Sequence, residues 1–263
     1  MSNIFTKIAD LARAVAGKPP LPQKTAAIVL AAGASSRMGG EVPKQLMEIC
    51  DKPVMIHSLL AFEKSDFISD IILVTPEGCE REYRMLAKAY GIGKLSAVVA
   101  GGDTRTKSAA NGFKKLGADV KYVAIHDAAR CLVTPEIIDR VCLAAVKYNA
   151  ATAATRSTDT IKISGKNKFV DHTEDRNHVW LAQTPQVFLC DLYRAASYIA
   201  EGACLNPTDD NALIENVNHK VRLVECGKYN MKITTPEDLV VAEAILKARE
   251  TTPATLPDDE DEI

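Results

Sequence analysis

The chain has 263 residues, of which 47% are hydrophobic and 25% charged, so it can bury a full core without disulfides or a structural metal. The formal net charge of −2 excludes the broad basic surface that bulk binding of nucleic acid requires. Seven cysteines, an odd number with no Cys-x-x-Cys pair, argue against a disulfide framework or a zinc site and indicate small buried hydrophobes in a reducing compartment.

The two ends of the chain differ in composition from its body. Residues 1–24 are predicted to form an amphipathic helix and linker, because apolar residues recur at helical spacing before a cluster of prolines, at Ile4, Ile8, Leu11, Val15, Pro19, Pro20 and Pro22. Such a helix either packs on the body or contacts a membrane surface or a partner. Residues 251–263 end in an acidic run and are predicted to be a disordered tail. No stretch reaches the roughly 20 apolar residues of a membrane span, and residues 1–24 lack a secretory signal core, so we expect a cytoplasmic protein.

Between these ends, residues 25–250 alternate between strand-like and helical segments. Strands are expected at 26–30, 71–74, 97–100 and 122–125, and helices near 54–62, 80–90, 106–116 and 135–148. Thr134-Pro135 and Thr235-Pro236 each place a capping residue before a proline suited to the first turn of a helix. The alternation predicts one α/β domain with a largely parallel, twisted sheet and helices on both faces.

The alternation is interrupted at about 156–178, where a β-hairpin is predicted. Residues 159–163 and 168–171 have the composition of two short strands, and the polar, glycine-containing segment 164–167 between them suits a turn. Because nothing else in this segment continues the α/β pattern, we expect the hairpin to be an arm that extends from the domain.

The first candidate site directly follows the strand at 26–30. Residues 31–38 read Ala-Ala-Gly-Ala-Ser-Ser-Arg-Met, and Pro43-Lys44-Gln45 comes shortly after them. Glycine lets backbone amides approach an anion closely, and the cations Arg37 and Lys44 can offset the charge of a polyphosphate. The segment has neither the Gly-Lys-Ser/Thr ending of a Walker A loop nor the Gly-x-Gly-x-x-Gly of a dinucleotide fold, so it indicates a different class of nucleotide-handling protein.

A second candidate site follows the strand at 97–100. Ligands of open α/β sheets bind beyond the carboxyl ends of the strands, so polar residues placed there are the ones to examine. The pair Gly101-Gly102 either supplies free amides to a phosphate or only permits a turn with positive φ. The residues after it that can hold a base, a ribose or a phosphate are Asp103, Arg105 and Ser108.

A third group of polar residues follows the strand at 122–125. Asp127 is a candidate ligand for Mg²⁺, which prefers one or two carboxylates together with substrate phosphates, and Arg130 can face a second anion. His126 is equally well explained as a packed, hydrogen-bonded residue, and it is not assigned as a metal ligand because no second histidine is suitably spaced. Lys232 lies in a short extended segment before a predicted helix.

Taken together and in order, these motifs resemble the 2-C-methyl-D-erythritol 4-phosphate cytidylyltransferases of the non-mevalonate isoprenoid pathway. The resemblance runs from about residue 25 to residue 247 and also includes segments at 159–162, 182–186, 208–210 and 232–239. It implies a Rossmann-like nucleotidyltransferase fold whose hairpin arm is exchanged between the two subunits of a homodimer. The implied reaction is attack of the sugar-alcohol phosphate on the α-phosphate of CTP, with release of pyrophosphate.

The resemblance also implies roles for individual residues. Arg37 and Lys44 would stabilise the charge around the α-phosphate in the transition state. Asp127 would hold Mg²⁺ and contact the substrate, with Arg130 nearby. The nucleotide would be bound by Ala31, Ala32, Gly33, Ala34, Ser35, Gly102, Asp103, Arg105 and Ser108. The phosphate of the second substrate would be bound by Arg176 and Lys232, with Thr160 and Thr184 beside them, and residues 160 and 176 would act in the neighbouring subunit's site.

Three alternatives share much of this pattern. A ribitol-5-phosphate cytidylyltransferase of teichoic acid synthesis would have the same phosphate loop and scaffold. A sugar-1-phosphate nucleotidyltransferase differs by few contacts to the base. A non-catalytic nucleotide-binding scaffold is disfavoured because simple binding does not require paired cations around an α-phosphate.

Overall fold

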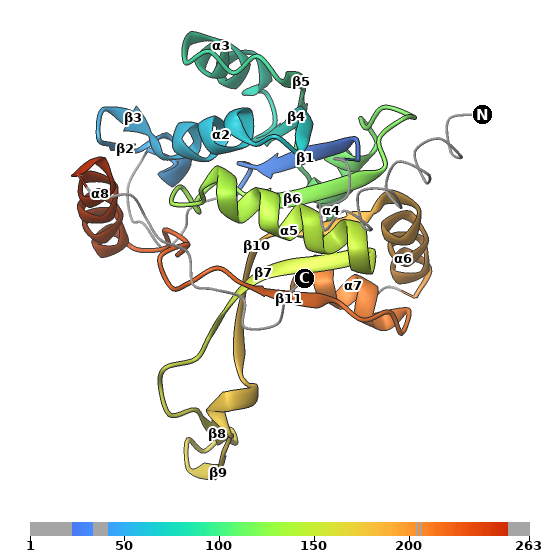
Figure 1. Cartoon of the computed structure of the whole chain (residues 1–263), viewed down its shortest axis with the longest axis vertical. Helices are drawn as coiled ribbons and strands as arrows, with labels where there is room; N and C mark the ends of the chain where they lie inside the picture. Colours follow the sequence, from blue (N-terminus) through green and yellow to red (C-terminus); the bar gives the residue numbers. More distant parts are fainter. Residues whose placement is uncertain (1–22, 34–41, 204, 206, 252–263) are drawn as a thin grey trace, which may run out of the picture.

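A seven-stranded sheet forms the centre of the molecule, with the strand order β11-β7-β10-β6-β1-β4-β5 (Figure 1). The computed structural model describes residues 23–33, 42–203, 205 and 207–251, so the predicted N-terminal helix and nearly all of the acidic tail lie outside the described residues. The strands of the sheet are β1 (Thr25–Leu30), β4 (Ile68–Thr75), β5 (Leu95–Ala100), β6 (Tyr122–Asp127), β7 (Ala150–Arg156), β10 (Trp180–Leu189) and β11 (Arg222–Glu225).

The sheet is largely parallel, as predicted. β1 pairs in parallel with both β4 and β6, β4 with β5, and β11 with β7, whereas β10 runs antiparallel to its neighbours β6 and β7. The carboxyl ends of β1, β4, β5 and β6 therefore meet at one edge of the sheet, which is where loops that bind ligands collect in open α/β folds.

Helices cover both faces of the sheet. One face packs on α2 (Val54–Lys64), α3 (Glu80–Ala89) and α5 (Pro135–Tyr148), and the other on α4 (Arg105–Phe113), α6 (Cys190–Gly202) and α7 (Asp210–Asn216). At one side of the molecule, α8 (Pro236–Thr251) contacts a small hairpin of β2 (Glu48–Ile49) and β3 (Lys52–Pro53) (Figure 1). The remaining short helices are η1 (Lys44–Leu46) and η2 (Arg176–His178).

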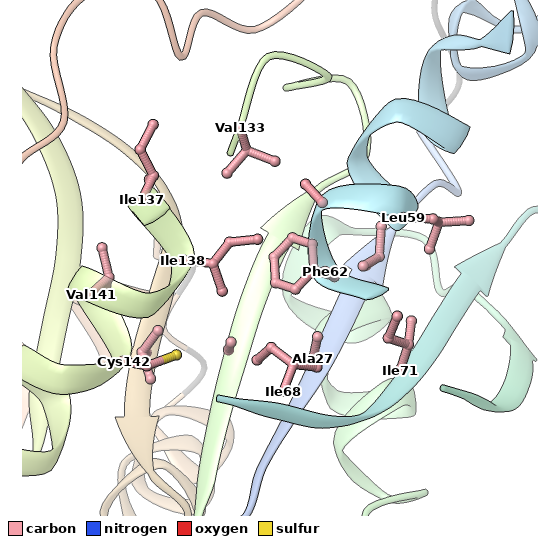
Figure 2. Packing of buried hydrophobic residues seen from close by; sticks show 14 of the residues in the cluster. Ala27, Leu59, Phe62, Ile68, Ile71, Val133, Ile137, Ile138, Val141 and Cys142 are labelled. Atoms are coloured by element: carbon pink, nitrogen blue, oxygen red, sulfur yellow. The ribbon is translucent and has the colours of Figure 1, made fainter. Parts of the chain in front are cut away.

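Side chains that alternate along each strand separate the core into two layers. Ala27 of β1 belongs to the cluster beneath α2 and α5, while its neighbour Ile28 belongs to the cluster beneath α4 and α6. Figure 2 shows the first layer, where Phe62 of α2 and Ile138 of α5 lie over the sheet. Because both faces of the central strands are buried, these strands are nearly continuous apolar runs, which is why the sequence located them.

Most predicted elements are confirmed, with small differences at their ends. The helix at 135–148 has the expected bounds, and the Thr134 side chain accepts a hydrogen bond from the backbone N–H of Ile137 at 3.4 Å. The helix expected at 106–116 ends at Phe113, because the next two turns use tighter i to i−3 hydrogen bonds before Gly117. At the second predicted start, α8 begins at Pro236 as expected, and the Asp238 carboxylate accepts the backbone N–H groups of residues 234 and 235.

The predicted hairpin forms an arm that extends away from the sheet (Figure 1). Its strands are β8 (Lys162–Ser164) and β9 (Val170–Thr173), which pair antiparallel and are exposed along their whole length. The first strand starts three residues later than expected, and the preceding residues form the connection from β7. Exposed apolar side chains occur on and beside the arm, at Ile163, Phe169, Val170 and Leu181.

The described cysteines and helices agree with the expectations from composition. Six cysteines lie in the part of the chain that the structure describes, all six have free thiols, and four of them are buried. Within the same residues no helix is both long enough and apolar enough to cross a membrane.

Candidate active site

A cavity of about 310 Å³ lies at the carboxyl ends of the central strands. Loops that follow three different strands line it, together with a lysine from the segment before α8. The predicted site residues that the structure brings together there are Ala31, Ala32, Gly33, Lys44, Gly102, Asp103, Arg105, Ser108, Asp127 and Lys232. Arg37, Ala34 and Ser35 lie outside the described residues.

The parallel pairing of β1 with β6 explains how distant residues meet in this cavity. Leu30 at the end of β1 is in register with Asp127 at the end of β6, so the loop after β1 and the carboxylate lie side by side. Gln45, which is 2% exposed, donates its side-chain amide to the carbonyl of Ala31 at 2.7 Å. This bond ties the short helix that carries Lys44 to the loop after β1, a role for Gln45 that the sequence analysis missed.

The double glycine after β5 is required by close packing. A Cβ atom at position 101 would lie 2.5 Å from the Cβ of Ala32, and one at position 102 would lie 2.5 Å from the Cβ of Lys107. Neither glycine is among the described residues with positive φ, so the alternative explanation of a left-handed turn is wrong. The hydroxyl of Ser108 accepts the backbone N–H of Gly102 at 3.0 Å and holds this turn against the start of α4.

Two cations converge on the carboxylate of Asp127. The Nε of Arg105 lies 3.1 Å from one oxygen, and the Nζ of Lys232 lies 2.8 Å from the other. Burial by itself would raise the pKa of Asp127, but Arg105 and Lys232 outweigh it and hold that pKa well below its usual range. The cavity therefore contains an ionised carboxylate flanked by two positive charges, all three within reach of a ligand.

Arg105 contacts a second carboxylate that does not line the cavity. Its Nη1 forms an ion pair with Asp210 at the start of α7, and the hydroxyl of Tyr193 donates to the other oxygen of Asp210 at 2.8 Å. Burial alone would lower the pKa of Arg105, yet Asp210 and Asp127 together raise it above its usual value. Sequence reasoning included Asp210 in a motif at 208–210 but gave it no role, because no pattern in the sequence places α6, α7 and α4 together.

Behind Asp127 lies a buried polar pair. The hydroxyl of Thr184, which is 3% exposed, accepts the backbone N–H of Asp127 at 3.1 Å and lies 2.9 Å from Nδ1 of His126. Burial lowers the pKa of His126 to about 3, so its imidazole is neutral, as the packed interpretation of this residue expects. Thr184 thus supports the backbone of Asp127 and is not among the residues that line the cavity.

Besides Thr184, three residues predicted to bind the second substrate do not line this cavity. Arg130 is partly buried and donates from its Nη1 to the carbonyl of Asn230 at 2.9 Å. Burial lowers the pKa of Arg130, with Asp127 acting in the opposite direction. Thr160 and Arg176 lie on the exposed arm, where the Arg176 guanidinium donates to the carbonyl of Thr158 at 3.2 Å. A single chain therefore does not bring arm and cavity together.

The cavity suits a divalent cation only in combination with a ligand that brings oxygens of its own. The described residues contain no group of three or more His, Cys, Asp or Glu side chains that could hold a metal ion. Of the two described carboxylates that line the cavity, Asp103 is exposed and pairs with Lys107, whereas Asp127 lies beside Arg105 and Lys232. One carboxylate plus phosphate oxygens is the arrangement typical of Mg²⁺ sites for nucleotides, so the residues present fit that mode of binding.

Comparisons with known proteins agree with this geometry. The family model described as 2-C-methyl-D-erythritol 4-phosphate cytidylyltransferase matches residues 25–248. Curated proteins of that name from Pelotomaculum thermopropionicum and Alkaliphilus oremlandii are 42% and 41% identical over 228 residues, which cover 86% of this chain and 96% of each relative. The crystal structure of 4-diphosphocytidyl-2C-methyl-D-erythritol synthase from Anaerococcus prevotii superposes with a TM-score of 0.77 at 31% identity, covering 86% of this chain and 97% of that one. The chain therefore belongs to the 2-C-methyl-D-erythritol 4-phosphate cytidylyltransferase family.

Proposed function

We propose that this protein joins CTP and 2-C-methyl-D-erythritol 4-phosphate to give 4-diphosphocytidyl-2-C-methyl-D-erythritol and pyrophosphate. The observation that carries the proposal is the cavity in which Lys44, Arg105 and Lys232 gather around the ionised Asp127. Such a site is suited to a triphosphate beside a second phosphate, and the family of the chain supplies the identity of the two substrates.

In the proposed reaction, a phosphate oxygen of the sugar alcohol attacks the α-phosphorus of CTP. One P–O bond forms there while the bond to the bridging oxygen of the β-phosphate breaks, and pyrophosphate leaves. The attacking phosphate is already an anion, so no side chain has to act as a covalent nucleophile or remove a proton. Catalysis then comes from positioning and from electrostatic stabilisation of charge in the transition state, the part assigned to Lys44 and Arg37.

The turn at Gly101-Gly102 and the start of α4 are the proposed nucleotide site. Close packing of Gly101 on Ala32 and of Gly102 on Lys107 holds this turn at the cavity, which Gly102, Asp103, Arg105 and Ser108 line. The loop after β1, including Ala31 to Ser35, would complete this site on the phosphate side. Asp127 would hold Mg²⁺ together with phosphate oxygens, and the bound ion would neutralise part of the triphosphate charge.

A homodimer with exchanged arms accounts for the residues that lie apart from the cavity. Thr160 and Arg176 are exposed on the arm, as are the apolar side chains of Phe169 and Val170, which are 74% and 59% exposed. Apolar side chains that extend from a domain in this way are typical of surfaces that another chain covers. In the proposed dimer, Arg176 of one subunit joins Lys232 of the other at the phosphate of methylerythritol phosphate, with Thr160 nearby, while Thr184 acts from behind by holding the backbone of Asp127.

Pyrophosphate release by the purified protein tests the proposal directly. The enzyme is given CTP and Mg²⁺ with methylerythritol 4-phosphate, with ribitol 5-phosphate, or with neither acceptor. Release that depends on methylerythritol 4-phosphate, and is much slower with ribitol 5-phosphate, is the expected result. Preference for ribitol 5-phosphate, or no acceptor-dependent release, would contradict the proposed substrate.

A further inference from the structure

Arg105 has two carboxylate partners in very different surroundings. Asp127 lines the cavity, and its side chain retains 11% of its exposure, whereas the side chain of Asp210 is 1% exposed and does not line the cavity. A cation that enters the cavity with a nucleotide can therefore reach Asp127 and compete with Arg105 for it, but it cannot reach Asp210. The two nitrogens of Arg105 that make these ion pairs differ in the same way. Nε pairs with Asp127 in the accessible cavity, and Nη1 pairs with the enclosed Asp210.

Asp210 is fixed on several sides by groups that take no part in the cavity. The hydroxyl of Tyr193 donates to one carboxylate oxygen at 2.8 Å, and the side-chain carbonyl of Gln186 accepts the backbone N–H of Asp210 at 3.0 Å. Asp209, one residue earlier, begins α7 as its N-cap and receives the amide of Gln186 at 2.8 Å. These bonds hold the carboxylate in one place while its remaining oxygen pairs with Arg105.

We propose that Asp210, held by Tyr193, is a positioning residue that keeps Arg105 aimed into the nucleotide site when the Mg²⁺ that accompanies a nucleotide takes its other partner, Asp127. In the described structure Arg105 pairs with both Asp127 and Asp210, and Lys232 pairs with the other oxygen of Asp127. If Asp210 were absent, Arg105 would depend on Asp127 alone, and binding of Mg²⁺ at Asp127 would release the arginine to adopt other rotamers. Keeping a long cation in a single geometry saves the entropy that it would otherwise lose on binding the nucleotide.

The inference rests on the proposed function, since it takes CTP as the ligand of the cavity. Asp210→Asn is the main variant because it keeps the volume of the side chain and an acceptor for Tyr193 while removing the charge that faces Arg105. Asp191→Asn is the matched control, the same substitution at an exposed carboxylate on α6 that pairs with the exposed Arg194. The measurement is the Kd for CTP by titration calorimetry in the presence of Mg²⁺, with KM for methylerythritol phosphate measured in parallel.

Asp210→Asn is expected to weaken CTP binding by about tenfold, the lower end of the contribution of a hydrogen bond to a charged group. The Kd of the Asp191→Asn control should stay within about twofold of that of the unmodified protein. KM for methylerythritol phosphate is expected to change by less than about twofold, a separation that general loss of structure would not produce. In an Arg105→Ala background, Asp210→Asn should have no further effect, because its action passes through the arginine.

Unchanged CTP binding in a folded Asp210→Asn protein would overturn the inference, and so would a full additional loss in the Arg105→Ala background. Tyr193→Phe removes only the hydroxyl that holds Asp210 and gives the same test if Asp210→Asn does not fold, with an expected loss of about threefold. Failure of the proposed function has a different signature, because then the unmodified protein would not bind CTP or would not use methylerythritol phosphate.

Discussion

The Nζ of Lys232 lies 2.8 Å from Asp127, although the two residues are 105 positions apart in the chain. The lysine comes from the extended segment before α8 and the aspartate from the end of β6, so the pair links the C-terminal part of the chain to the centre of the sheet. A second phosphate that entered the cavity would meet a cation already held in place by Asp127.

Lys232→Ala should therefore weaken the binding of methylerythritol phosphate more than that of CTP. We expect KM for the sugar-alcohol phosphate to rise about tenfold to a hundredfold, since a hydrogen bond between charged groups contributes about 1.5–3 kcal/mol. Steady-state kinetics with each substrate varied in turn measures both effects. Lys228→Ala, which removes an exposed lysine from the same segment, is the control and should leave both KM values unchanged. An equal rise in the two KM values would argue against the assignment of Lys232 to the second substrate.

The buried His126 should make the protein less stable as the pH falls below neutrality. Its folded-state pKa of about 3 lies below the value of 6.5 for a free histidine, so the unfolded chain binds the extra proton first. The stability that the neutral imidazole provides is complete above pH 6.5 and is lost as the pH falls towards 3, with a slope of about 1.4 kcal/mol per pH unit. Urea unfolding should thus give a loss of about 2 kcal/mol between pH 6.5 and pH 5.

His126→Gln should remove this part of the pH dependence, whatever its effect on stability at pH 7. His178→Gln serves as the control, because the side chain of His178 is 86% exposed on the arm. If the unmodified protein and His126→Gln showed the same slope between pH 6.5 and pH 5, protonation of His126 would not be the cause.

Gly101→Ala should separate the loop after β1 from the turn after β5. The new methyl group would lie 2.5 Å from the Cβ of Ala32, and neither backbone can move without disturbing the cavity. We expect a loss of about 1–3 kcal/mol in unfolding free energy and a rise in KM for CTP. Gly202→Ala, where an added Cβ meets nothing within 4 Å, should show neither effect. A stable Gly101→Ala protein with normal CTP kinetics would show that the close approach is not needed.

Mixing two inactive variants can show whether the arm acts in the neighbouring subunit. Arg176→Ala alters the arm and Lys44→Ala alters the cavity, so a heterodimer of the two would contain one site with both residues intact. Co-expression or subunit exchange should therefore restore part of the pyrophosphate release that each variant lacks. Lys44→Ala mixed with Lys232→Ala is the control, because both residues line the same cavity of one chain and no intact site can form. Equal recovery in the two mixtures, or none in either, would count against arm exchange.

The residues that the sequence predicted best are those whose local pattern reflects burial on both sides. Examples are the apolar runs of β1, β4 and β6 and the capped helix at 135–148. Burial in the core requires apolar residues, and the first turn of a helix favours a capping residue followed by proline, so both can be recognised in the sequence. The glycine turn and Asp127 were also found, since ligand-binding residues of such sheets follow the strands directly. β7 was not predicted because its sequence, Ala-Ala-Thr-Ala-Ala-Thr-Arg, has no large apolar residue to mark it.

What the sequence could not give are the contacts that depend on tertiary packing. Asp210 lies in a polar stretch that reads as a helix start, and only the meeting of α4, α6 and α7 turns it into a partner of Arg105. Thr184 likewise resembles an ordinary strand residue until β10 is placed beside β6. Thr184 holds the backbone of Asp127, and Asp210 pairs with Arg105 from outside the cavity. The spacing of residues in the sequence indicates neither contact.

Strand β10 connects the arm with the residues that support the cavity. Trp180 at its start pairs with Arg156 beside the arm, while Thr184 and Gln186 further along it contact the backbones of Asp127 and Asp210. The register of β10 against β7 shifts between Ala182 and Gln186, so inserting or deleting one residue in this stretch would move Thr184 and Gln186 away from their partners. The length of β10 between Trp180 and Gln186 is therefore fixed by contacts at both of its ends, one at the arm and one behind the cavity.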